Sequence, residues 1–147
     1  MAYYSTHSQL VQYAGVLRDC GIDDWDDLQA EAYRVVNRDI ELGWYRRQAD
    51  ARDISYTETR FDPAELEDST PMVALEVFKL IELAGDYMSQ HPGTADARDM
   101  WQELRDRFAT RYGAELESVL ALGLDYNWSD SEDDDISPIK ARRLSRF

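Results

Sequence analysis

Residues 69–88, STPMVALEVFKLIELAGDYM, constrain the fold more than any other stretch, because their apolar positions cover nearly every side of a helix. Ser69 or Thr70 as N-cap, with Pro71 in the first turn, is a typical helix start. Such a helix must be covered by other chain, so we expect it at the centre of the fold or in a subunit interface. Its apolar residues are Met72, Val73, Leu75, Val77, Phe78, Leu80, Ile81, Leu83 and Ala84.

Three more helices are expected around this segment. The first covers about residues 8–17, with Thr6 or Ser8 as its N-cap. The second begins in the acid-rich stretch GIDDWDD, buries one apolar stripe and ends around residues 44–45. The longest covers about residues 96–122, and Gly123 is suited to a left-handed C-terminal stop.

The segment ADARDISYTETRFDP changes character, since β-favouring residues replace the helix formers. Residues 53–61 form either one extended strand, one arm of a hairpin or a long loop, and the sequence favours none of the three. The next stretch, FDPAEL, restarts a helix with Asp62 as cap and Pro63 in the first turn. The expected fold class is mainly α: a small helical bundle with one long C-terminal core helix and an extended C-terminal arm.

Charge divides the chain of 147 residues into two parts. Residues 1–128 carry 25 acids and 12 bases, a net charge of −13, and we take them as one helical domain. Residues 129–147 form an acidic spacer followed by a basic arm, which from Pro138 onward has four cations and no anion. Ordering costs roughly 1–2 kcal/mol per residue, and the arm has little apolar surface to offset it. The arm therefore stays loose or docks onto something.

Several function classes find no support in the sequence. His7 and His91 join no Ser, Cys or carboxylate in a known catalytic pattern, and phosphate-binding, HExxH and GxSxG motifs are absent. DDWDD lacks the spacing and central glycine of a calcium loop, and the lone Cys20 provides neither a disulfide nor a zinc ligand set. We therefore predict no enzyme, no metal and no cofactor.

The longest apolar run is far below the roughly 18 residues that span a bilayer, and the first residues do not form a signal peptide. We expect a protein made in the cytoplasm, with no membrane partner. An acidic body repels a phosphate backbone, so specific binding to DNA is not expected either.

The stretch LRDRFATRYGAELESVLALGLDYNW, residues 104–128, resembles the last core helix of tailed-bacteriophage head-tail connector (adaptor, neck) proteins. That helix often ends in a Gly-Ile/Leu-Asp-Tyr-Asp-Trp type sequence, and here Asn127 stands where Asp is expected. LQAEAYRVVNRDIELGWYR and PMVALEVFKLIELAGDYM are similar to the same group, as is an arm that ends in arginines. The similarity covers roughly residues 21–128.

The resemblance implies a structural virion protein at the head-tail junction, where a ring under the portal joins the DNA-filled head to the tail. Such rings usually follow the twelvefold symmetry of the portal. The implied partners are the portal protein, neighbouring copies of the chain and a downstream tail or neck protein. DNA would pass through the channel without specific binding, because an acidic wall repels the duplex.

Two sets of residues are candidates for contacts. The arm would dock on the portal or on a neighbouring subunit, through cations that pair with carboxylates and apolar side chains that fill pockets. The docking residues are Ile139, Lys140, Arg142, Arg143, Leu144, Arg146 and Phe147. Aromatic residues without cations around them suit a core or a protein interface better than base stacking. These subunit-interface or core anchors are Trp44, Tyr45, Phe78, Trp101, Phe108, Tyr112, Tyr126 and Trp128.

A second class of function fits the net charge of −14. Some small acidic phage proteins mimic DNA and occupy the basic cleft of a host nuclease or repressor. Carboxylates on helix surfaces would serve that role, but the basic arm argues against it, because a cationic target would repel the arm.

Overall fold

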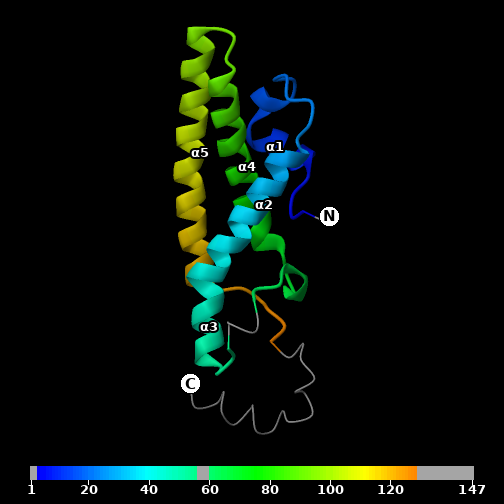
Figure 1. Ribbon diagram of the computed structural model, residues 1–147, viewed down its shortest axis with the longest axis vertical. Coiled ribbons are helices and arrows are strands. Elements are labelled where there is room, and N and C mark those ends of the chain that lie inside the picture. The colour runs from blue at the N-terminus through cyan, green and yellow to red at the C-terminus, as the bar shows by residue number, and fades with distance from the viewer. Residues whose placement is uncertain (1–2, 56–59, 129–147) are drawn as a thin grey trace.

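The computed structural model describes residues 3–55 and 60–128, which form an elongated, mainly helical bundle (Figure 1). The longest element is α5, Ala95–Leu122, which lies alongside α4, Thr70–Gln90. Helix α2, Asp26–Ile40, crosses this pair. Helix α1, His7–Tyr13, is the first helix of the chain and packs against α4. The expected fold class, mainly α with one long C-terminal helix, is confirmed. The predicted docking residues, 139–147, lie outside the described residues.

Helix α4 is the centre of the bundle, as its sequence predicts. It packs against α5, α2 and α1, and its buried residues point in every direction around the helix axis. Ser69 is its N-cap and Pro71 lies in the first turn, as expected. The buried side chains include Met72, Leu75, Val77, Phe78, Leu80, Ile81 and Ala84.

The backbones of α4 and α5 come very close at Gly85. A Cβ placed there would lie 3.0 Å from both the amide nitrogen of Arg105 and the carbonyl oxygen of Trp101. Thr94 caps α5, since its hydroxyl accepts a hydrogen bond of 3.1 Å from the amide of Ala97. The helix stops at Gly123, whose φ of +80° confirms the expected glycine stop.

The second helix does not end around Trp44 and Tyr45, so that prediction was wrong. After Ile40 the chain makes one π-helical turn, Glu41–Tyr45, and continues as α3, Arg46–Ala51. A π turn accommodates an extra residue without ending the helix, and here it lets both aromatic side chains of the pair point inward. They are 6% and 3% exposed, so the aromatic pair marks burial rather than a helix end.

The N-terminal helix is shorter than expected. It begins after Thr6, which forms a capping box with Gln9, but it ends at Tyr13. Ala14 leaves helical geometry, and residues Gly15–Leu17 form a separate 3-10 turn. The single helix predicted for residues 8–17 is thus two pieces.

Residues 56–59 of the ambiguous segment 53–61 lie outside the described residues. In the described parts of the chain no strand forms, and one isolated antiparallel bridge joins Leu66 to Tyr126. Asp62 is the N-cap of the next element, as expected, because its carboxylate accepts a hydrogen bond of 3.0 Å from the amide of Ala64. The element that follows is only a 3-10 turn, Pro63–Glu65, rather than a longer helix.

Candidate functional site

Aromatic rings gather at the base of the bundle, the end opposite the α4–α5 turn. The residues of this base cluster are Trp44, Tyr45, Phe61, Tyr126 and Trp128. Tyr45 stacks on Trp128 with ring centroids 5.2 Å apart, and Phe61 stacks on Tyr126 at 5.6 Å. Aromatic pairs in such geometries stabilise by about 0.5–1.5 kcal/mol beyond the area they bury.

The base cluster is closed by the chain itself, through the strap, residues 123–128, which runs from the end of α5 across the base (Figure 1). The amide of Glu67 donates to the carbonyl of Asp125 at 2.9 Å, and the amide of Asn127 donates to the carbonyl of Glu65 at 2.8 Å. The hydroxyl of Tyr126 accepts from the amide of Asp62 at 3.0 Å. The strap is therefore held by backbone bonds as well as by its rings.

Asn127 has a side-chain partner in the segment before α4. Its side-chain amide donates to the carboxylate of Glu65 at 3.1 Å. An Asp at this position would bring a second carboxylate against Glu65, whereas the amide supplies a donor. An amide at position 127 thus matches the carboxylate that faces it.

Trp128 ends the described part of the chain at the base. The guanidinium of Arg52 lies 4.4 Å from its ring centroid, a cation–π contact that covers the half-buried indole. Burial lowers the pKa of Arg52 below its usual range. The tail, residues 129–147, lies outside the described residues.

The other predicted anchors lie between α4 and α5. Phe78 and Phe108 pack with ring centroids 5.8 Å apart, and both are buried together with Trp101 and Tyr112. The hydroxyl of Tyr112 donates to the carboxylate of Asp39 at 2.7 Å, which ties α5 to α2. Burial, followed by that hydrogen bond, raises the pKa of Tyr112 above its usual range. Within the single chain these side chains are core.

Glu76 is a polar residue that the sequence reasoning missed. It lies on α4 with no exposed surface, and its carboxylate accepts from the amides of Ser5 at 2.9 Å and Tyr4 at 3.2 Å. The hydroxyl of Ser5 and the side-chain amide of Gln29 also donate to it. This Glu76 clamp fixes the N-terminal segment to the central helix. Glu82 of the same helix also lies between apolar neighbours, so the sequence does not single out Glu76.

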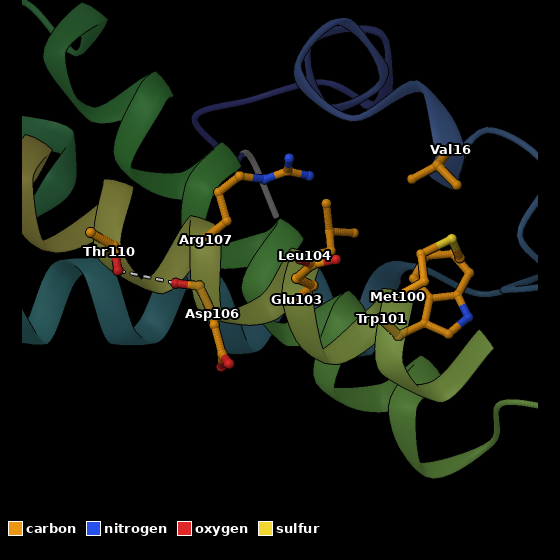
Figure 2. Close-up of a pocket in the computed structure, with 8 residues that line it drawn as sticks. All are labelled: Val16, Met100, Trp101, Glu103, Leu104, Asp106, Arg107 and Thr110. Atoms are coloured by element: carbon orange, nitrogen blue, oxygen red, sulfur yellow. Dashed lines mark hydrogen bonds between the residues drawn. The ribbon is translucent and has the colours of Figure 1, made fainter. Parts of the chain in front are cut away.

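A groove lies between the 3-10 turn Gly15–Leu17 and the first half of α5 (Figure 2). Its volume is about 630 Å³. Figure 2 shows Val16 on one side, facing Met100, Trp101 and Leu104 on the other. The groove is lined by Val16, Met100, Trp101, Glu103, Leu104, Asp106, Arg107 and Thr110.

Neither a metal centre nor a membrane span emerges from residues 3–55 and 60–128. In these ranges no three His, Cys, Asp or Glu side chains gather in a way that could hold a metal ion. No helix in them is long and apolar enough to cross a bilayer. Comparisons with protein-family models, with curated proteins and with solved structures found no match.

Proposed function

We propose that this chain is a structural protein of a tailed-phage head-tail junction, where copies of it form a ring that joins the portal to the tail. The proposal starts from the resemblance of residues 104–128 to the last helix of connector proteins. The observation that carries it is the strap. Tyr126 and Trp128, the aromatic residues of the connector-like ending, pack at the base with Trp44 and Tyr45. The connector-like ending is thus part of the packed base.

The strap is suited to transmit force from the tail to the helical bundle. It is bonded to residues 62–67 and stacked on the π turn, so a pull on the tail would be passed to the bundle rather than peeling α5 away. Charge-assisted pairs between the arm's arginines and partner carboxylates contribute about 1.5–3 kcal/mol each. When every subunit of a ring makes such contacts, the ring is held strongly to its partner although each contact is weak.

The acidic body suits a channel wall. With a net charge of −13 on residues 1–128, a ring would repel the phosphates of passing DNA rather than hold them. Binding of the isolated protein to duplex DNA should be undetectable at moderate salt. Tight, salt-sensitive binding would argue against this role.

Static light scattering, with and without purified portal, tests the proposal. We expect a complex of ring size with portal, and loss of that complex when residues 139–147 are deleted. Circular dichroism of the deleted protein should be unchanged, because the described core lies within residues 3–128. If portal is never bound at physiological salt and the protein instead binds a basic host nuclease, the DNA-mimic function is the correct one.

A further inference from the structure

The groove next to the 3-10 turn combines a buried apolar floor with exposed apolar side chains at its edges. Trp101 and Leu104 form its floor and are 6% and 4% exposed, as in a protein core. Val16 and Met100, at its edges, are 48% and 42% exposed. Exposed apolar side chains that gather beside a groove mark a contact site for another chain.

The polar residues of the groove differ in how far they are already engaged. Asp106 is paired with Arg105 at 3.0 Å, and its backbone carbonyl accepts from the hydroxyl of Thr110. The guanidinium of Arg107 lies 5.6 Å from the ring centroid of Phe108. Glu103, in contrast, forms no ion pair with any residue in the described ranges. Arg107 forms no ion pair within those ranges either, so the groove offers an apolar floor, one unpaired carboxylate and one guanidinium turned to a ring.

The chain contains a segment of complementary chemistry. Residues 139–147, IKARRLSRF, combine Ile139, Leu144 and Phe147 with four cations and no anion. An extended stretch with apolar side chains for the floor and a cation for Glu103 is what the groove accommodates. The volume of about 630 Å³ is in the range of sites that enclose small ligands or a few side chains.

We propose that this groove receives the basic arm, residues 139–147, of a neighbouring copy of the chain. The choice of a neighbouring copy as the source of the arm rests on the proposed function, because a ring brings each tail beside the next subunit. Leu144 or Phe147 would fill the space over Trp101 and Leu104, and an arginine would pair with Glu103. A contact from the tail of one copy to the groove of the next is head-to-tail, the type that closes into rings.

The tail is long enough to extend beyond its own subunit. The acidic spacer, residues 129–138, can extend up to about 33–36 Å from the base.

Disulfide trapping between two different chains tests the inference. Both chains are full length and carry Cys20→Ser, so that no other thiol is present. One carries Met100→Cys at the groove and a tag that changes its size, and the other carries Leu144→Cys on the arm. The matched control replaces Met100→Cys with Ser118→Cys, which is exposed on the same helix but outside the groove.

Under mild oxidation, with and without portal, we expect the M100C–L144C mixed disulfide to form at least about tenfold faster than the S118C–L144C product, because docking raises the local concentration. Glu103→Gln should slow the reaction severalfold, and Glu117→Gln, another exposed acid of α5, should not. Equal rates for groove and control would overturn the inference. So would a single chain with both cysteines that forms only an internal disulfide, since the groove would then hold its own arm.

The result separates the two proposals. If portal complexes form by light scattering but the mixed disulfide does not, the groove assignment is wrong and the connector function stands. If the mixed disulfide forms in the free protein but portal is never bound, the groove assignment stands without the connector function.

Discussion

The base cluster and the groove are built from the same kinds of residues, yet one is closed and the other open. At the base, the strap lays Tyr126 and Trp128 over Trp44 and Tyr45, so the rings are covered by the chain itself. In the groove, Trp101 and Leu104 are as buried as the rings of the base, but Val16 and Met100 at its edges are left largely exposed. An apolar residue type therefore predicts burial in general. Whether the side chain is buried by its own chain or left exposed for a contact with another chain depends on the segment that packs over it.

The largest difference between the two regions is expected from truncating one side chain in each. Trp44→Ala, at the base, should lower the free energy of unfolding by about 3–5 kcal/mol, because it leaves a cavity under the strap. Met100→Ala, at the edge of the groove, should change it by less than about 0.5 kcal/mol, since this side chain is largely exposed. Urea denaturation followed by circular dichroism measures both. Similar losses for the two variants would mean that the groove is closed in solution.

The Glu76 clamp holds the N-terminal segment that precedes one wall of the groove, so breaking it should affect the groove more than the base. Glu76→Ala leaves buried backbone donors at Tyr4 and Ser5 without a partner, and each costs about 1–3 kcal/mol. Hydrogen exchange should rise in α1 while the amides of α5 next to the strap stay protected. Glu117→Ala, on the exposed side of α5, is the control and should leave exchange in α1 unchanged.

The floor of the groove depends on the close approach of α4 and α5 at Gly85. Gly85→Ala puts a methyl group against the backbone of Trp101 and Arg105, and overpacking of this kind costs about 1–3 kcal/mol. Gly113→Ala is the matched control on α5, with nothing within 4 Å of the new Cβ, and should stabilise by about 0.5–1 kcal/mol. Thermal unfolding should therefore move in opposite directions for the two. A tolerated Gly85→Ala would show that the helix pair can spread.

The smallest effect is a pH dependence at Tyr112, midway between the two regions. Its pKa is raised by burial and by the bond to Asp39, so the folded phenol keeps its proton at a pH where the unfolded phenol loses it. The stabilisation is full below about pH 10, the unfolded pKa, and is lost as pH rises above it, by at most about 1.4 kcal/mol per unit. Urea denaturation between pH 9 and 11 should show a shallower decline for Tyr112→Phe than for the parent. Identical slopes would mean that Tyr112 does not contribute.

Local patterns in the sequence were enough to predict the two longest helices, α4 and α5. The all-round apolar run of residues 69–88 requires cover on every side, and α4 is the central helix. Pro71 and Gly123 act within one helical turn, and both mark the element ends as predicted. Such signals involve neighbours three or four positions apart, so they do not depend on the rest of the chain.

The strap, the π turn, the Glu76 clamp and the groove were decided only by the tertiary structure. The π turn exists because Trp44 and Tyr45 are buried against a strap some eighty residues later in the chain, and no local period encodes that contact. Glu76 is stable in the core only because Tyr4 and Ser5 bring their amides to it. Long-range partners of this kind are chosen by what remains uncovered once the helices have packed, which is why residue type and spacing alone did not predict them.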